Sequence, residues 1–225
     1  MNDRDFDDAR DAADWINLVE GPGAESRRDR LFRLFTTLQS VASNGDVLDI
    51  GCGQGACRLY FDPKRWNYWG VDPSCHLLAR ARVLHEDAAA FFSPGNAYAI
   101  PFESSRFHAA ISINVWHLLR NLEMAAREMM RVLKSDGRFL VITAHPQSIH
   151  IWAEYYHAHQ LHGKHLIGSS LRDDGSKSVD ELYFYSEEEI RQELVDSGAC
   201  GVTVQSFGVT ESTVPMYLAI FGQKI

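Results

Sequence analysis

The chain has 225 residues, 45% of them hydrophobic, which is enough for one domain with a full apolar core. Its 30 acidic and 22 basic residues give a formal net charge of -8 without a dense basic block, which argues against a nucleic-acid partner. No apolar run reaches the roughly 18 residues that cross a bilayer, the four cysteines form no Cys-x-x-Cys pair and the N-terminus is acidic, so a cytoplasmic protein outside the membrane is expected.

The first elements predicted are two helices, over residues 8–20 and 26–41. In the second, Ser26 is placed to cap the helix, and leucines and Phe35 recur on one face. Gly-Pro-Gly at 21–23 breaks the chain between them. We expect residues 1–43 to form an N-terminal helical cap that precedes the core.

From residue 46 onward, strand-like and helix-like segments alternate. Strands separated by helices predict right-handed crossovers and a parallel sheet. The predicted strands are 46–50, 68–72, 89–92, 107–113 and 137–144, and the predicted helices are 55–61, 74–84 and 122–133. We expect residues 44–146 to form a Rossmann-like core.

Residues 147–182 interrupt the alternation with aromatic, His-rich and then polar sequence, which indicates an inserted lid. Ser186 and Glu189 then have the spacing of a capping box that opens another helix. Two closing strands follow, joined by a short link, so they should pair antiparallel within the segment 183–225. The predicted fold is α/β: a Rossmann-like, seven-stranded, mostly parallel sheet with an antiparallel last strand and helices on both faces.

The stretch "VLDIGCGQG" runs from a strand into three glycines within five positions. Bare backbone at the start of a helix lets a ligand approach the amides closely. Taken alone, the stretch also satisfies the dinucleotide pattern G-x-G-x-x-G/A through Ala56, with Asp72 near the place of the ribose-binding acid. A tight turn without a ligand is a third explanation.

Four motifs in order resemble one family. They are "VLDIGCGQG", "YWGVDPS", "GNAYAIPFESSRFHAAIS" and "REMMRVLKSDGRFLVITAHP", and they cover about residues 44–146. Together they resemble the class I S-adenosylmethionine-dependent methyltransferases, in the small-molecule branch with the ubiquinone-biosynthesis-like pattern. Asn96 replaces the aspartate usual in the third motif, and Ser135-Asp136-Gly137 replaces the usual Pro-Gly-Gly.

The resemblance implies where S-adenosylmethionine would bind. The methionine part would lie on a loop in which side chains at the glycines would occupy the cofactor's volume, and that loop is Asp49, Gly51, Cys52, Gly53 and Gly55. Asp72 would accept both ribose hydroxyls. The adenine would lie beside Pro73 and Ser74 with Asn96 and Ala97 at its edge, and the ammonium would meet the backbone carbonyl of Ile113 or Asn114. Trp15 and Arg28, or its neighbour Arg27, would close over the cofactor.

Methyl transfer from a sulfonium mainly requires proximity, alignment and exclusion of water. His117 follows the fourth strand and His145 ends the fifth, so each is a candidate base or acceptor clamp, with ordinary packing as the alternative. If residues 149–162 are helical, Tyr155 shares a face with His159 and His162, as in an aromatic lid. Surface histidines or a metal site are alternatives for this segment, and no metal is expected.

These observations predict a methyltransferase, monomeric or homodimeric, whose small-molecule acceptor is planar or aromatic and is methylated at oxygen or nitrogen. A nicotinamide-dependent oxidoreductase that uses the same glycine loop is the first alternative. The second is a non-catalytic protein that binds S-adenosylmethionine and acts through interactions.

Overall fold

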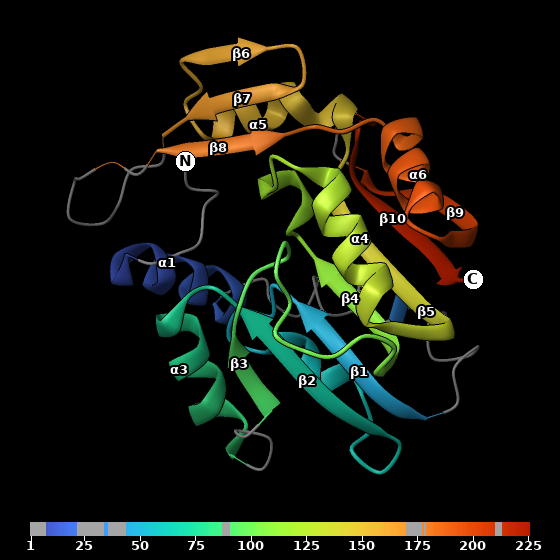
Figure 1. Cartoon of the computed structure of the whole chain (residues 1–225). Coiled ribbons are helices and arrows are strands. Elements are labelled where there is room, and N and C mark those ends of the chain that lie inside the picture. The colour runs from blue at the N-terminus through green and yellow to red at the C-terminus, as the bar shows by residue number, and fades with distance from the viewer. Residues whose placement is uncertain are drawn as a thin grey trace.

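A seven-stranded sheet forms the centre of the protein in the computed structural model, which describes residues 8–21, 34–35, 44–86, 91–169, 177, 179–209 and 213–225. The strand order is β3-β2-β1-β4-β5-β10-β9 (Figure 1). The strands are β1 (Gly45–Ile50), β2 (Trp66–Asp72), β3 (Phe92–Pro94), β4 (Phe107–Ile113), β5 (Leu133–Ala144), β9 (Ala199–Val209) and β10 (Pro215–Lys224). β1 pairs in parallel with β2 and β4, whereas β10 runs antiparallel to β5 and β9. The predicted fold class is confirmed.

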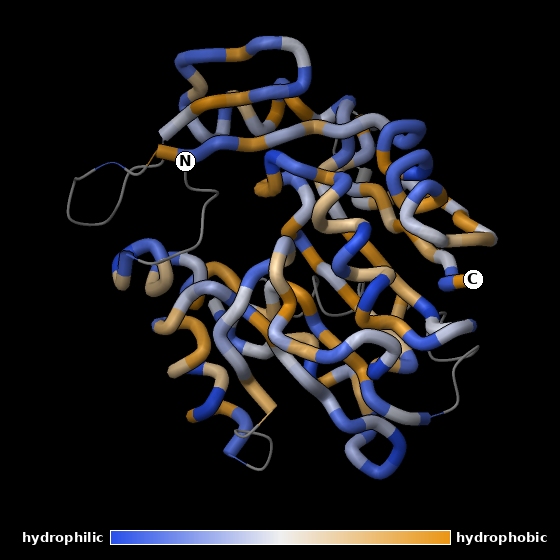
Figure 2. The backbone as a smooth tube through the Cα atoms, in the orientation of Figure 1, coloured by the Kyte–Doolittle hydropathy of each residue, from blue (hydrophilic) through white to orange (hydrophobic). Residues whose placement is uncertain are grey.

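Helices cover both faces of this sheet. Alternate residues of each strand point to opposite sides, and both sides are apolar and packed against helices. Leu48 and Ala110 lie in the apolar cluster with α4 (Leu122–Val132) and α6 (Glu187–Asp196). Val47 and Ala109 lie in the other cluster, with α3 (Cys75–Leu84) and Phe61. Figure 2 shows the hydrophobic residues gathered in the central strands.

The helices begin at capping residues that the sequence supplies. The side chain of Ser74 accepts from the Leu77 amide at the start of α3, and Ser186 and Glu189 form the predicted capping box of α6. α1 (Ala9–Glu20) follows Asp8 and matches the first predicted helix. Among the described residues, no helix is long and apolar enough to cross a membrane.

Some predicted boundaries differ from the structure. The segment after the glycines forms only a short 3-10 helix, η1 (Ala56–Tyr60), in place of a longer helix. β5 starts earlier than predicted, at Leu133, with an irregular register opposite β4. Of the predicted helix 26–41, only residues 34–35 are described, and they are helical.

The described part of the inserted segment forms a small sheet and a short helix, and the condition considered above, a helix over 149–162, holds only as far as Tyr155. α5 (Ile149–Tyr155) ends before His157, which has φ +44°. A three-stranded sheet follows, made of β6 (Gln160–His162), β7 (His165–Gly168) and β8 (Asp180–Tyr183). His159 and His162 therefore do not share a helical face with Tyr155. The turn His162-Gly163-Lys164-His165, with Gly163 at φ +60°, is the local sequence signal for this hairpin.

Candidate functional site

The glycine loop lies at the carboxyl end of β1, which pairs with β2 on one side and with β4 on the other. The strand order reverses between β1 and β4, and open α/β sheets bind ligands at such a point. The amides of Gly51 and Cys52 donate to the carbonyl of Val71 at 2.8 and 3.0 Å. The Gly53 amide donates to Asp72 Oδ2 at 2.8 Å, and the Ser74 amide donates to Asp72 Oδ1 at 2.9 Å. The buried carboxylate of Asp72 thus joins the loop to the start of α3.

The three glycines of this loop have positive φ, at +76° for Gly51, +52° for Gly53 and +75° for Gly55. A Cβ on Gly51 would lie 2.3 Å from Val115 Cγ2, and one on Gly55 would lie 2.9 Å from the Phe92 ring. At Gly53 the nearest atom is Trp15 Nε1, at 3.4 Å. The protein's own packing therefore requires Gly51 and Gly55, which differs from the predicted reason of cofactor volume.

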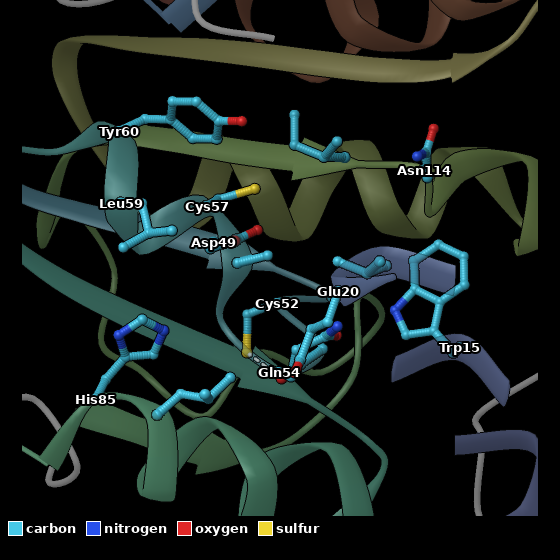
Figure 3. A pocket seen from close by; sticks show the side chains of 16 residues that line it. Trp15, Glu20, Asp49, Cys52, Gln54, Cys57, Leu59, Tyr60, His85 and Asn114 are labelled. Carbon is cyan, nitrogen blue, oxygen red and sulfur yellow. Dashed lines mark hydrogen bonds between the residues drawn. The ribbon is translucent and has the colours of Figure 1, made fainter. Parts of the chain in front are cut away.

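A cavity of about 400 Å³, which we call the first cavity, lies between this loop, α1 and η1 (Figure 3). Trp15 and Asn114 stand at one end of it and His85 and Leu59 at the other (Figure 3). α1 is held on α3 by the Arg80 guanidinium, which donates to both carboxylate oxygens of Glu20 at 3.1 and 2.6 Å. The predicted residues that line the cavity are Trp15, Asp49, Gly51, Cys52, Gly53, Ile113 and Asn114.

Three buried polar atoms that line the first cavity have no hydrogen-bond partner among the described residues. They are Asp49 Oδ1, Gln54 Nε2 and Asn114 Oδ1. Burying such atoms without a partner costs about 1–3 kcal/mol each, so their position against one cavity indicates a polar ligand that supplies the missing bonds. The sequence motifs did not single out Gln54 as a ligand-binding residue. A long polar side chain between two glycines is a local signal that could have indicated this role.

Asp49 is the titratable group of this cluster. Burial raises its pKa from 3.8 to about 7, with a further increase from the negative charge of Asp72. The Tyr68 hydroxyl, which donates to the other carboxylate oxygen, Oδ2, and the neighbouring Cys57 thiol oppose this increase. Near neutral pH the carboxyl group is therefore divided between its neutral and ionised forms, and a cation in the cavity would favour the ionised form.

Asn114 holds an unusual backbone position directly after β4. Its φ is +61°, a region that residues other than glycine seldom adopt, and its amide donates to the carbonyl of Ile142 at 2.8 Å. Asn tolerates this conformation better than bulkier side chains. Backbone strain of this kind is typical of functional sites.

A second cavity of about 260 Å³ adjoins the first, since Trp15 and Asn114 line both. Its other lining residues are Leu18, His117, Ile151, Trp152, Tyr155, Tyr156, Met216 and Tyr217. The Trp152 ring is stacked on Tyr156, with centroids 5.9 Å apart and planes 11° apart. The structure thus brings two predicted residues, His117 and Tyr155, into one aromatic cavity beside the glycine loop.

The His117 ring is buried and lies 5.8 Å from the Trp152 ring. Thr143 Oγ1 lies 3.5 Å from its Nδ1. His145 has a different place: its Nδ1 accepts from the Gln147 amide at 3.1 Å, which caps the short helix η4 (Pro146–Ser148), and burial lowers its pKa. It lines neither cavity.

Several residues predicted to hold a cofactor also lie outside both cavities: Gly55, Asp72, Pro73, Asn96 and Ala97. Asn96 Oδ1 accepts from the amides of Tyr98 and Ala99, so it stabilises its own turn. Arg28 and Arg27 lie outside the described residues. Lining residues that the sequence analysis missed include Glu20, Cys57, Tyr60 and His85.

Comparison with known proteins shows that the region containing the glycine loop is similar to methyltransferases. A family model described as "Methyltransferase domain" matches residues 48–141. A fatty-acid O-methyltransferase of Mycolicibacterium smegmatis is 30% identical over 116 residues, which are 50% of this chain and 42% of that protein. A ubiquinone/menaquinone biosynthesis C-methyltransferase of Enterobacter sp. is 30% identical over 173 residues, which are 72% of this chain and 66% of that protein. The chain thus spans about two fifths to two thirds of the length of these relatives.

Solved structures share the fold over most of the chain. A Pyrococcus horikoshii protein has a TM-score of 0.75 at 16% identity, with 92% of this chain and 93% of that chain covered. The geranyl diphosphate C-methyltransferase of Streptomyces coelicolor, solved with Mg²⁺, geranyl diphosphate and S-adenosylhomocysteine, has a TM-score of 0.62 at 12% identity, covering 86% of this chain and 79% of that chain. At these identities the similarity concerns the fold alone.

Proposed function

Because the chain belongs to the class I S-adenosylmethionine-dependent methyltransferases, we propose that it transfers a methyl group from S-adenosylmethionine to a small-molecule acceptor. The observation that carries the proposal is the pair of adjoining cavities, one beside the glycine loop and one lined by aromatic rings. A two-substrate transfer needs two binding volumes that meet at the reacting atoms.

The first cavity fits the amino-acid end of the cofactor. Asp49 Oδ1 and Asn114 Oδ1 are acceptors suited to an ammonium, and Gln54 Nε2 is a donor suited to a carboxylate. We propose these three side chains as its ligands, with the Gly53 backbone beneath the chain that joins them. When bound, the cofactor supplies an electrophilic methyl group on a sulfonium.

Trp15 and Asn114 stand at the junction of the cavities, so we assign them the alignment of the two substrates. The rings of the second cavity support a planar or aromatic acceptor, because flat rings stack on one another. We assign His117 the role of holding the acceptor's nucleophilic oxygen or nitrogen and taking its proton, with Tyr155 at the rim. Displacement of water from this aromatic volume favours transfer over hydrolysis.

Binding measurements test this proposal. Isothermal titration with S-adenosylhomocysteine and, separately, with NAD should show binding of the first ligand only. Preferential NAD binding would support the oxidoreductase alternative. Binding of S-adenosylhomocysteine without any methylated product, when the protein is incubated with labelled S-adenosylmethionine and a panel of phenols and heteroaromatic amines, would support the non-catalytic alternative.

Asp72→Ala should weaken S-adenosylhomocysteine binding by about 1–3 kcal/mol, the usual cost of unpaired buried polar groups. The structure adds a reason to the predicted ribose contact, since the substitution also frees the amides of Gly53 and Ser74 that hold the loop. Titration calorimetry measures the change. Asp46→Ala is the control, because Asp46 lies at the opposite end of β1 from the loop; an unchanged affinity of the Asp72 variant would place the ribose elsewhere.

We also propose the division of the chain into the cap 1–43, the core 44–146, the lid 147–182 and the closing segment 183–225. In this division the lid supplies α5, whose side chains form one wall of the second cavity. A cytoplasmic location, the absence of a nucleic-acid partner and a monomeric or homodimeric state stay predictions from the sequence.

A further inference from the structure

The end of β8 is fastened to the loop that follows His117. Tyr183 and Tyr185 point to the same side, as alternate residues of an extended segment do, and their rings are stacked with centroids 6.1 Å apart. The Tyr185 hydroxyl donates to the carbonyl of Leu119 at 2.6 Å, and Arg120 Nε donates to the Tyr183 hydroxyl at 2.9 Å. Both tyrosines therefore bind the residues directly after the 3-10 helix η3 (Trp116–Leu118).

Glu181 completes this contact. Its Oε2 accepts from Arg120 Nη2 and from the Tyr183 hydroxyl, each at 2.9 Å. His165, the register partner of Tyr183 on β7, is stacked on the Tyr183 ring with centroids 4.6 Å apart and planes 4° apart. We call Arg120, Glu181, Tyr183 and Tyr185 the clasp. Charge-assisted bonds in a connected set of this kind hold a geometry better than an isolated surface pair does.

The clasp joins the two walls of the second cavity. One wall is His117, whose helix η3 ends immediately before Leu119 and Arg120. The other wall is α5, and its Trp152, together with Tyr156 directly after the helix, packs in one apolar cluster with Leu166 and Leu182 of the lid sheet. Leu118 of η3 packs in the same cluster. In Figure 1, β8 lies beside β7 and α5 and leads toward α6. The distance between His117 and Trp152 thus depends on where β8 is held.

We propose that Arg120 is a positioning residue for the acceptor, which acts through the clasp to set the spacing between His117 and Trp152. Arg120 is not among the residues that line either cavity. The inference rests on the proposed function, because it assumes that the second cavity takes the acceptor. Under this proposal, Arg120 controls the affinity for the acceptor without changing the affinity for the cofactor.

The test uses two ligands on the full chain. The first is S-adenosylhomocysteine, measured by titration calorimetry. The second is 2-naphthol, a planar aromatic alcohol, measured by quenching of tryptophan fluorescence in the presence of saturating S-adenosylhomocysteine. Arg120→Ala should weaken 2-naphthol binding about tenfold and change S-adenosylhomocysteine binding less than about twofold. Tyr183→Phe keeps the ring stack but removes the hydroxyl, and should weaken 2-naphthol binding about threefold.

Arg127→Ala is the matched control. Arg127 also pairs with a glutamate, Glu123, at 2.6 Å, but on the exposed face of α4 and outside the clasp. It should leave both affinities unchanged. Equal 2-naphthol affinity in Arg120→Ala, Tyr183→Phe and the wild type would overturn the inference, and so would an equal loss for both ligands, which indicates general destabilisation. A wild type that fails to bind S-adenosylhomocysteine would instead overturn the proposed function, and one that binds it but not 2-naphthol would overturn the assignment of the second cavity.

Discussion

Asp49→Asn is expected to weaken S-adenosylhomocysteine binding about tenfold at neutral pH and, at the same time, to make the unliganded protein more stable. The cofactor loses a negative acceptor for its ammonium. The empty protein loses a buried carboxylate whose ionisation opposes folding, while the amide oxygen of Asn can still accept from the Tyr68 hydroxyl. Calorimetric titration and urea unfolding of the same two proteins measure both effects.

The stability difference should depend on pH with a defined sign. The carboxyl group of Asp49 has a pKa of about 7 in the folded chain against the ordinary 3.8. Between about pH 4 and pH 7 the folded state therefore binds one proton more than the unfolded state. Stability of the wild type therefore falls as pH rises through this window, by about 4 kcal/mol at most for three pKa units. Asn does not ionise, so Asp49→Asn should show its full advantage above about pH 7 and little below about pH 4. A constant advantage at all pH values would contradict this assignment.

Cofactor binding should follow the same proton. An ammonium beside Asp49 favours the ionised carboxylate, so binding releases a proton when the free site is protonated. Affinity in the wild type should fall by up to about tenfold per pH unit below pH 7 and level off above it. Titrations at neutral pH in two buffers of different ionisation enthalpy count the released proton, and Asp49→Asn should lack this release. Identical proton counts in the two proteins would show that Asp49 keeps its protonation state.

Gly51→Ala is expected to lower the free energy of unfolding by about 3 kcal/mol. Two costs add here. The backbone has φ +76°, and the new Cβ would lie 2.3 Å from Val115 Cγ2. Because Val115 follows Asn114, relief of this clash moves the junction of the two cavities, so S-adenosylhomocysteine affinity should fall as well. Urea unfolding and calorimetric titration measure the two losses.

The chain offers a matched control at Gly163, which has φ +60° but no atom within 4 Å of an added Cβ. Gly163→Ala should therefore lose only the backbone cost, about 1 kcal/mol. The double variant Gly51→Ala/Val115→Ala removes the clashing methyl groups and should recover part of the loss. If Gly51→Ala were no less stable than Gly163→Ala, contact with Val115 would have no energetic role.

Local patterns predicted the central sheet, whereas the family resemblance pointed to seven of the residues that line the first cavity. Alternating strands and helices, the capping box at Ser186 and the glycines after β1 each depend on a few neighbouring residues. Backbone conformation and one-sided burial leave such short-range signals. The Rossmann-like fold class and the antiparallel closing strands followed from them, whereas the place of Asp49 and Gly53 followed from the family resemblance.

The second cavity and the form of the lid did not follow in this way. Trp15, Asn114, Trp152 and Tyr217 come from four distant parts of the chain and meet only when α1, β4, α5 and β10 are assembled. The helical spacing of residues 149–162 was a local pattern too, but pairing of β6 with β7 and of β7 with β8 satisfied the backbone of the later residues instead. A cavity is a property of packing between elements, and no neighbouring residues in the chain record which other element will face them.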